Sequence, residues 1–328
     1  MTAKHAHILM PGPDRPASDV ALSSLASERL RIFPVLKAIN AARWKVSLGD
    51  RAASSANVVL IGKPGAQNIE HRSRAWLDQL QLWQRQGARL FLDYTDHHLG
   101  KTSPMTAFYE NAIAVCSEVL VPTEALKTTV GNLVPGKTIS VVEDLLEYPT
   151  VKPIDKGTAT SKRCLWFGHP SNADFLARFI DDNSGAMANH ELVIISLPQT
   201  VDILKRYRFQ NRPSLKLSFQ PWSKSTLLEA ARHADYCIIP SDSNSSKRYA
   251  SNNRLVTALA LGLPTIATAI PSYQEFSDYF AGEGTQQADE IMANPNVAHN
   301  KIVAFQDTEV SRFQLPSIMG AWQQLLLA

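Results

Sequence analysis

Cysteine is scarce in this sequence of 328 residues, which contains only Cys116, Cys164 and Cys237 and no Cys-x-x-Cys motif. A sparse, odd-numbered set argues against a disulfide framework and a zinc site, so we expect three reduced thiols in the core. Long apolar runs are absent too. No run approaches the roughly 20 residues of a membrane span, and Ile8-Leu9-Met10 is too short for the apolar region of a signal peptide. A cytoplasmic protein is therefore expected.

Charge is also low: charged residues make up 19% of the chain, and the net charge is only +3. Binding of nucleic acid usually requires a concentrated basic stripe, so a nucleic-acid partner is not expected. The mild basicity is compatible with an anionic ligand or a membrane surface. Hydrophobic residues, at 45%, are sufficient for a large core, and the length suits two domains.

Short apolar runs alternate with segments of helical spacing, which is typical of parallel α/β sheets. In the first half, strands are expected at residues 6–10, 45–48, 58–62, 89–94, 119–122 and 139–143. Helices are expected there at residues 21–42, 74–86, 107–115 and 124–130. In the second half, strands are expected at residues 164–167, 192–195, 215–219, 236–239 and 265–267. The pattern therefore predicts two α/β halves of similar size.

The alternation stops between residues 149 and 163, where proline, glycine, lysine and threonine replace the large apolar residues. This stretch is the best linker candidate. We predict a first domain at residues 1–150 and a second at residues 151–305. Residues 306–328 are predicted to supply a C-terminal helix, amphipathic over 316–327, that packs back on the first domain.

The most informative segment is a polar and cationic helix start that follows an expected strand and a polar loop. Its members are Lys247, Arg248, Ser251, Asn252, Asn253 and Arg254. A helix start offers backbone N–H groups and the positive end of the helix dipole, and Arg and Lys add charge, so the segment suits a phosphate or diphosphate. The alternative is a solvated basic loop in which Ser251 or Asn252 caps the helix.

A second candidate site, Gly168, His169 and Asn172, directly follows the first strand of the second half. Glycine lets the backbone approach a ligand closely, and Asn172 could cap the next helix. The alternative is an ordinary turn between a strand and a helix. Both candidates lie at the carboxyl ends of strands in the same half, which favours a common ligand.

A third candidate is the segment Asp93-Tyr-Thr-Asp96-His97-His98 at the end of the fourth strand of the first half, with Asp96, His97 and His98 as its catalytic candidates. Such side chains can orient a hydroxyl group or transfer a proton. Adjacent histidines face different ways and no third ligand stands at a recognisable spacing, so a metal site is not favoured. A helix cap by Asp96 is the alternative.

Three cations of the first half are candidates for acceptor binding: Arg29, Arg31 and Lys63. Arg29 and Arg31 are two residues apart and lie on different faces of a helix, so only one can point at an interdomain cleft. At least one of them is expected on a solvated face. Lys63 follows a strand at another carboxyl-edge position, and it too could either bind the acceptor or lie on a solvated face.

Several segments resemble the donor half of GT-B glycosyltransferases, specifically the retaining glycogen synthase-like group of bacterial nucleotide-sugar enzymes. They are Ala-Leu-Ala-Leu-Gly-Leu-Pro-Thr-Ile-Ala-Thr (258–268), Pro-Ser-Tyr-Gln-Glu-Phe (271–276), Gln-Pro-Trp-Ser (220–223) and the stretch 228–241 that ends in Pro-Ser. In the first half, Ser-Glu-Arg-Leu-Arg (27–31) resembles the Ser-x-Arg-Leu-Arg segment of some members. The resemblance covers most of the chain and is strongest at residues 163–276.

The resemblance implies a GT-B fold, in which two Rossmann-like parallel-sheet domains face a cleft. The second domain would hold a nucleotide-sugar donor, with Gly168, Lys247, Asn253 and Arg254 around its diphosphate. The first would hold the acceptor, with Asp96, His97 or His98 near the transferred sugar. Glu275 stands where relatives carry an acidic residue near the donor.

One pair of residues departs from the family pattern. The retaining group usually carries a Glu, seven residues and a second Glu, whereas this chain has Tyr249 and Thr257 at those positions. The second Glu normally binds the ribose hydroxyl groups. The nucleotide would then be held differently, by Asn253 and Arg254, or catalysis is impaired, and the stereochemical outcome stays open.

The sequence thus predicts a metal-independent, hexosyltransferase-type enzyme that moves a sugar from a nucleotide-diphosphate sugar to a glycan or lipid-linked acceptor. The setting would be the synthesis of bacterial surface polysaccharide or glycoconjugates, with no cofactor and with peripheral contact at the inner face of the membrane as an option. Two alternatives remain: a non-catalytic protein that binds sugar nucleotides or acts as a scaffold, and a sugar-nucleotide epimerase. A dehydrogenase is less favoured because no Gly-x-Gly-x-x-Gly follows a strand. The oligomeric state is open.

Overall fold

The computed structural model describes residues 4–51, 55–155, 161–207, 215–243 and 246–327, and describes residues 246 and 247 by their backbone alone. The chain forms two compact α/β units. Unit 1 consists of Met1–Leu145, Tyr249–Ser251 and Arg312–Ala328, and unit 2 of Leu146–Arg248 and Asn252–Ser311.

Unit 1 contains a six-stranded parallel sheet with the strand order β2-β1-β3-β4-β5-β6. The strands are β1 (His5–Leu9), β2 (Lys45–Gly49), β3 (Val58–Ile61), β4 (Arg89–Asp93), β5 (Glu118–Val121) and β6 (Ile139–Val141). In the register, Ile61 pairs with Leu92 and Asp93 with Leu120, so neighbouring strands end at one level. The residues that follow β3, β4 and β6 therefore emerge at one edge.

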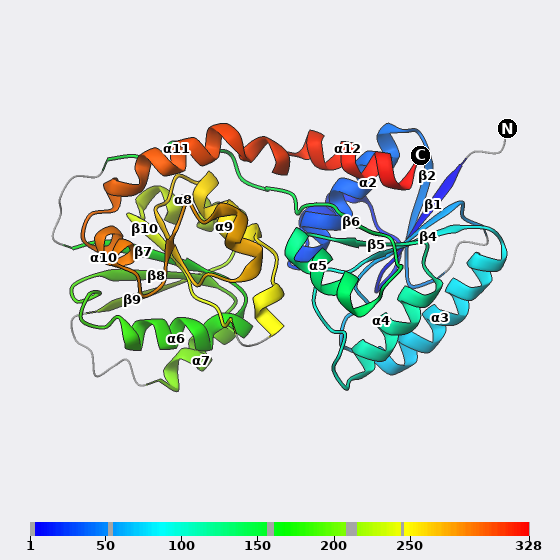
Figure 1. Ribbon diagram of the computed structural model, residues 1–328, viewed down its shortest axis with the longest axis horizontal. Coiled ribbons are helices and arrows are strands. Elements are labelled where there is room, and N and C mark those ends of the chain that lie inside the picture. The colour runs from blue at the N-terminus through cyan, green and yellow to red at the C-terminus, as the bar shows by residue number, and fades with distance from the viewer. Residues whose placement is uncertain (1–3, 52–54, 156–160, 208–214, 244–245, 328) are drawn as a thin grey trace. The chain divides into compact units, whose positions relative to one another are not determined.

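Helices cover both faces of this sheet (Figure 1). They are α1 (Ala17–Ala21), the π-helical turn η1 (Glu28–Ile32), α2 (Phe33–Ala41), α3 (Ile69–Arg85), α4 (Pro104–Val115), α5 (Glu124–Leu133) and α12 (Leu315–Leu326). The expected helix over 21–42 is wrong in extent, because a loop separates α1 from η1. In α3, the spacing of Trp76, Leu80 and Trp83 places all three in the core, as helical periodicity requires.

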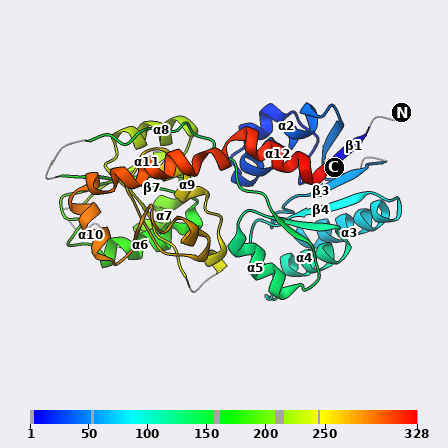
Figure 2. The same ribbon diagram turned by 45° about the horizontal axis from the view of Figure 1, so that its top comes forward.

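The C-terminal helix α12 packs beside α2 in unit 1, as both views show (Figures 1 and 2). Its Ile318, Trp322 and Leu326 are buried in one cluster with Ile8 and Leu60 of the sheet. Beside this cluster, the half-buried Gln323 amide donates to the carbonyl of Ala38 at 3.0 Å.

Unit 2 contains a second six-stranded parallel sheet with the order β12-β11-β10-β7-β8-β9. Its strands are β7 (Arg163–Phe167), β8 (Glu191–Ser196), β9 (Lys216–Pro221), β10 (Tyr236–Ile239), β11 (Thr265–Ala267) and β12 (Ala281–Gly282). Figure 1 shows α6 and α7 together on one face, whereas α8, α9 and α11 lie on the other. The α/β class and the two parallel sheets expected from the sequence are confirmed.

The α-helices of unit 2 are α6 (Ala173–Asp182), α7 (Gln199–Lys205), α8 (Lys224–His233), α9 (Asn253–Ala260), α10 (Gln286–Ala293) and α11 (His299–Thr308). Short 3-10 turns precede or follow them: η2 (Pro170–Asn172), η4 (Ser246–Tyr249), η5 (Pro271–Phe276), η6 (Pro295–Ala298) and η7 (Val310–Phe313), the last of which crosses into unit 1. All three cysteines are free and buried, so the prediction of reduced core thiols is confirmed. The helices described are too short or too polar to span a bilayer.

Candidate functional site

The turn after β7 sits at the carboxyl edge of the sheet in unit 2. The carbonyl of Gly168 accepts a hydrogen bond from the Ser196 hydroxyl at 2.6 Å. His169 caps η2, because its Nδ1 accepts from the backbone N–H of Ser171 at 3.2 Å. The predicted cap by Asn172 is wrong: its side chain is buried and makes no cap bond to α6. The preceding histidine supplies the polar contact at this turn instead.

Gly168 is packed too tightly for a larger residue. A Cβ atom there would lie 3.2 Å from Cζ2 of Trp166 and 3.3 Å from Nη1 of Arg254. The turn after β7 and the first turn of α9 therefore meet at this glycine. The sequence prediction that Gly168 and Arg254 share one site is consistent with this packing.

Arg254 is half-buried, with Trp166, Tyr273 and Cys237 near its side chain. Its Nη1 is buried and has no hydrogen-bond acceptor in the described structure, and the same holds for Nε1 of the fully buried Trp166. Burial raises the pKa of Tyr273, and the charge of the nearby Arg254 guanidinium offsets part of that rise. Burial likewise raises the pKa of Cys237, and the positive charge of Arg254 offsets part of that rise. A buried N–H donor without an acceptor costs free energy, so Nη1 is a suitable donor to an anion, while the same side chain also hydrogen-bonds Tyr273.

The first turn of α9 presents its backbone N–H groups without a cap from the residue before it. Asn252 is the N-cap residue and is 1% exposed, yet its side chain makes no cap bond. Its Nδ2 donates to Oε1 of Glu275 at 3.2 Å instead, and its Oδ1 is buried without a partner in the described structure. The predicted cap by Asn252 is therefore wrong. Glu275 acts on this helix start through that amide.

The remaining donor-side candidates are less well defined. Arg248 is exposed at the end of η4, and Asn253 is half-buried at the start of α9. The side chain of Lys247 lies outside the described residues. Ser251 belongs to unit 1, where its hydroxyl donates to Oδ2 of Asp144 at 2.5 Å.

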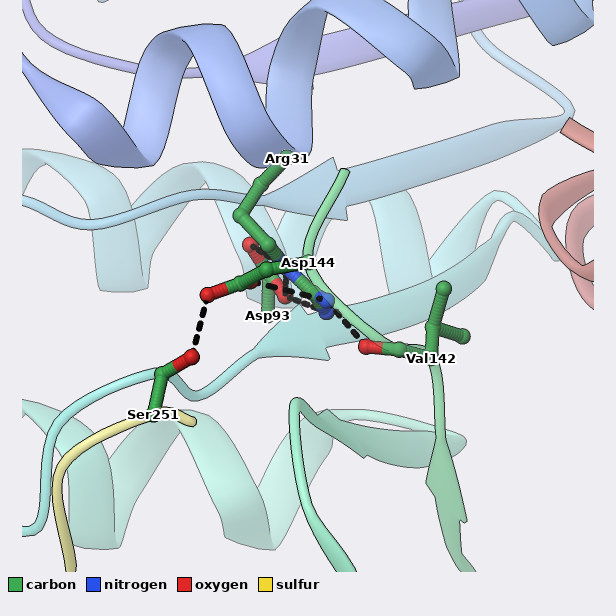
Figure 3. A network of polar contacts seen from close by, with 5 residues as sticks. All are labelled: Arg31, Asp93, Val142, Asp144 and Ser251. Carbon is green, nitrogen blue, oxygen red and sulfur yellow. Dashed lines mark hydrogen bonds and ion pairs between the residues drawn. The ribbon is translucent and has the colours of Figure 1, made fainter. Parts of the chain in front are cut away.

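In unit 1, a buried ionic network joins η1 to the ends of β4 and β6 (Figure 3). Nη2 of Arg31 binds Oδ1 of Asp93 at 2.6 Å, and its Nη1 donates to the Val142 carbonyl and lies 3.5 Å from Asp144. Burial alone would lower the pKa of Arg31, but the two carboxylates raise it. Burial raises the pKa of Asp144, opposed by Arg31 and Ser251. The network therefore stabilises a charged guanidinium inside the unit.

This network corrects the predictions for the two arginines. Neither lies on a solvated face: Arg29 is 6% and Arg31 1% exposed. Arg29 donates to the Ser23 carbonyl at 2.7 Å and so holds the loop before η1. The guanidinium of Arg31 is occupied by Asp93, which argues against the acceptor-binding role predicted for it.

Of the two acidic partners in this network, Asp144 was missed, and Asp93 was named in the third candidate segment but not chosen as a site residue. Asp93 and Asp144 each stand at or just after the end of a strand, which is the signal that could have identified them. A buried carboxylate needs a partner, but no local pattern pairs Asp93 or Asp144 with Arg31, which lies 62 and 113 residues away in the chain.

The predicted catalytic group follows β4. Asp96 forms an ion pair with Lys63, and both side chains are partly exposed. The backbone N–H of His98 donates to the Tyr94 hydroxyl at 2.6 Å, and its ring stacks on Tyr109 with centroids 5.2 Å apart. No cap bond by Asp96 is found at α4, where Ser103 is the cap.

The two histidines differ in what surrounds them. The His97 ring packs edge-on against Tyr249, with centroids 4.5 Å apart. Nε2 of His98 is buried and has no hydrogen-bond partner within the described chain. Burial lowers the pKa of both rings, and Lys101 lowers it further. Both rings are therefore neutral near pH 7, and Nε2 of His98 can accept or donate one hydrogen bond.

The described residues contain no group of three or more His, Cys, Asp or Glu side chains placed to hold a metal ion. The polar groups of both edges are instead cations, imidazoles and isolated carboxylates.

Two parallel sheets, each with its polar residues at the carboxyl edge, define the GT-B class of fold. Comparison with solved structures supports this assignment. The chain matches a glycosyltransferase from Rickettsia africae ESF-5 over 99% of both chains, with a TM-score of 0.62 and 9% identity. An alpha-glucosyltransferase (AGT) in complex with UDP matches over 98% of this chain and 99% of its own, with a TM-score of 0.59 and 12% identity.

A third match, Staphylococcus aureus TarM in a complex that includes UDP, has a TM-score of 0.55 and 11% identity, and covers 82% of this chain. The chain spans 55% of TarM. No protein-family model and no curated protein matches the sequence. At these identities the likeness shows the fold, and the GT-B fold predicted from the sequence is confirmed.

Proposed function

We propose that this protein is a glycosyltransferase that takes a sugar from a nucleotide-diphosphate sugar bound to unit 2. The observation that carries the proposal is the buried Nη1 of Arg254, which has no acceptor in the described structure and lies beside Gly168. The first turn of α9, which the Asn252 side chain does not cap, adds backbone N–H groups and the positive end of the helix dipole. A diphosphate would supply the acceptor that Nη1 of Arg254 lacks.

The same groups would stabilise the leaving group. As the bond between sugar and phosphate breaks, negative charge grows on the diphosphate, and preorganised donors lower the energy of that transition state. Arg254 and the α9 amides would do this without a metal ion and without a further cofactor. Lys247 and Arg248 precede this turn in the chain and would add positive charge.

Unit 1 would bind the acceptor. His98 is neutral near pH 7 because burial lowers its pKa, so Nε2 could take a hydrogen bond or a proton from a sugar hydroxyl. Lys63 and Asp96 would contact polar groups of the acceptor from the same edge. We propose a glycan or lipid-linked acceptor in the synthesis of bacterial surface polysaccharide or glycoconjugates, in the cytoplasm or at the inner membrane face.

The donor base is suggested by the neighbours. AGT and S. aureus TarM were both crystallised with UDP, so UDP is the first nucleotide to test. The glutamate that binds ribose in the retaining group is replaced by Thr257 in this chain. The ribose would then be held by Asn253 and other groups near α9.

Calorimetry with UDP, GDP, ADP and CDP on the wild-type protein and on Arg254→Ala tests the donor site. Loss of a charged hydrogen bond is worth about 1.5–3 kcal/mol, so the Kd of the selected nucleotide should rise about 10- to 100-fold. Arg178→Ala is the matched control, because Arg178 is exposed on α6, where its guanidinium lies over the Phe175 ring. Equal affinity of the Arg254→Ala and Arg178→Ala proteins for that nucleotide would overturn the proposed donor site.

Incubation with the matching sugar nucleotides separates the functional classes. Transfer to an acceptor supports the proposed enzyme. A new sugar nucleotide formed without acceptor would identify an epimerase. Binding without either reaction would identify a non-catalytic protein, the class favoured by Tyr249 and Thr257 in place of the Glu pair.

A further inference from the structure

The edge of the unit 1 sheet at which the strands begin is almost purely cationic. It lies opposite the edge that carries His98. Among the described residues that flank the strand starts and helix ends here, Glu118 is the only acid, and its carboxylate accepts a hydrogen bond from the Ser140 hydroxyl. The cations, which we call the amino-edge patch, are Lys4, Arg43, Lys45, Arg85, Arg89 and Lys137. With six cations against one acid, this edge carries more positive charge than the net +3 of the whole chain.

The strand order brings these cations into one row. The backbone N–H of Lys45 donates to the Lys4 carbonyl at 2.9 Å, so these two side chains start from neighbouring strands. Parallel strands lie about 4.8 Å apart, so the six strand starts span about 24 Å. All members of the patch except the half-buried Lys137 are exposed. Neighbours in this row lie within about one Debye length at physiological salt, so they act together on a charged surface.

Apolar side chains lie among the cations of the amino-edge patch. Leu82, one turn before Arg85 on α3, is 46% exposed, and Leu133, the last residue of α5, is 48% exposed. Trp44 is half-buried beside them in the sequence of strand starts, and the Lys4 ammonium lies 4.9 Å from its ring centroid. Leucine gains free energy on leaving water, and tryptophan favours the interface between a bilayer and water. Cations with interspersed apolar groups therefore suit a lipid surface better than a nucleic acid.

Unit 2 shows that a parallel sheet does not require such an edge. Cations at helix ends offset the helix dipole, and the helices of unit 2 also return to the edge where its strands begin. There, however, Arg163 pairs with Glu191 at 2.9 Å, and Asp235 accepts from the Arg163 backbone N–H at 2.6 Å. The helix α6 even ends in Asp181 and Asp182. The excess of cations is thus a property of unit 1.

We propose that the amino-edge patch binds the surface of a bilayer that contains anionic phospholipids. Lys and Arg of the patch bind lipid phosphate groups, while Leu82 and Leu133 enter the interface. The edge that carries His98 lies about 17 Å away, the length of a five-residue strand, so the bilayer does not cover it. This inference concerns where the protein is held, and it depends neither on the donor site nor on transfer of a sugar.

Sedimentation of the full-length protein with phosphatidylcholine vesicles, with and without phosphatidylglycerol, tests the patch. One Lys or Arg near an anionic surface strengthens binding about fivefold, so Lys45→Gln/Arg85→Gln should weaken binding to the anionic vesicles about 30-fold. The matched control is Lys205→Gln/Lys216→Gln, because these lysines end α7 and begin β9 in unit 2 and the charge change is the same. The control should bind like the wild type. Thermal unfolding of both double variants checks that they fold.

The remaining comparisons separate the partners and the functions. Leu82→Gln/Leu133→Gln should weaken binding to the anionic vesicles without a change in charge. Equal binding to both kinds of vesicle, or an equal loss in the two lysine and arginine double variants, would overturn the inference. Binding of a single-stranded oligonucleotide in place of the vesicles would identify a nucleic-acid surface and overturn it as well. If anionic vesicles bind through the patch but no nucleotide binds the wild type, the proposed function fails and this inference stands.

Discussion

Replacing Gly168 with alanine probes the packing between the β7 turn and α9. The new Cβ would lie 3.2 Å from Trp166 and 3.3 Å from Nη1 of Arg254, so one neighbour must give by a few tenths of an ångström. Trp166 is fully buried in the core of unit 2. The guanidinium of Arg254, at the end of a flexible side chain, is the group that can move, so we expect it to shift away from the diphosphate.

The size of the effect follows from what is displaced. Removing a preorganised donor from a developing anion lowers turnover about 100- to 1,000-fold. A small displacement of that donor should lower turnover by less. We expect Gly168→Ala to lower UDP affinity and turnover about tenfold each. Stability should change little. Gly168 does not have a positive φ, so the gain of about 0.4–1 kcal/mol from a stiffer unfolded chain offsets the tight contacts.

Calorimetry with UDP, initial rates and thermal unfolding of the variant check this prediction. Gly185→Ala is the matched control in the same unit, because a Cβ there meets nothing within 4 Å and its φ is also ordinary. If Gly168→Ala binds UDP as tightly as Gly185→Ala does, the steric reasoning about Arg254 is refuted.

Three further predictions concern stability. Gly320→Ala, in the exposed middle of α12 with open space around it, should raise the free energy of unfolding by about 0.5–1 kcal/mol in urea titrations; a decrease would contradict this. Gly262→Ala should lower the melting temperature by several degrees, because φ is +79° and a Cβ would collide with the Val151 carbonyl; calorimetric scans against Gly185→Ala test it. Burial lowers the pKa of His7 to about 4, so the unfolded state binds the extra proton between pH 6.5 and 4 and stability falls as the pH drops through that range. The loss should approach about 3 kcal/mol at pH 4, and His7→Gln should flatten the urea-derived profile below pH 6.5; an unchanged profile would rule out His7 as its source.

Most strands could be predicted from the sequence because their apolar runs are local signals. The expected strands at 236–239 and 265–267 coincide with β10 and β11, and the others agree within about two residues. The helical spacing of Trp76, Leu80 and Trp83 likewise gave the buried face of α3. The break between α1 and η1 was missed, since residues 22–26 contain neither proline nor glycine.

The candidate site was predictable only in part. Glycine, arginine and asparagine at strand ends could be identified from position, because the carboxyl edge of a parallel sheet collects them. What each side chain touches could not. Asp144 and Ser251 are 107 residues apart, and Asn252 and Glu275 are 23 apart. A local propensity favours Ser and Asn as caps, and both are drawn to acidic partners that only the folded chain brings near.

The helix α12 has a consequence for the order in which the protein can fold. Its Ile318, Trp322 and Leu326 share a buried cluster with Ile8 of the first strand, more than 300 residues earlier. During synthesis, the sheet of unit 1 therefore emerges with one apolar face incompletely covered, and it stays so until the whole of unit 2 has been made. Contacts of such long sequence separation form slowly, and exposed apolar faces promote aggregation. Of the two units, the one made first is therefore completed last.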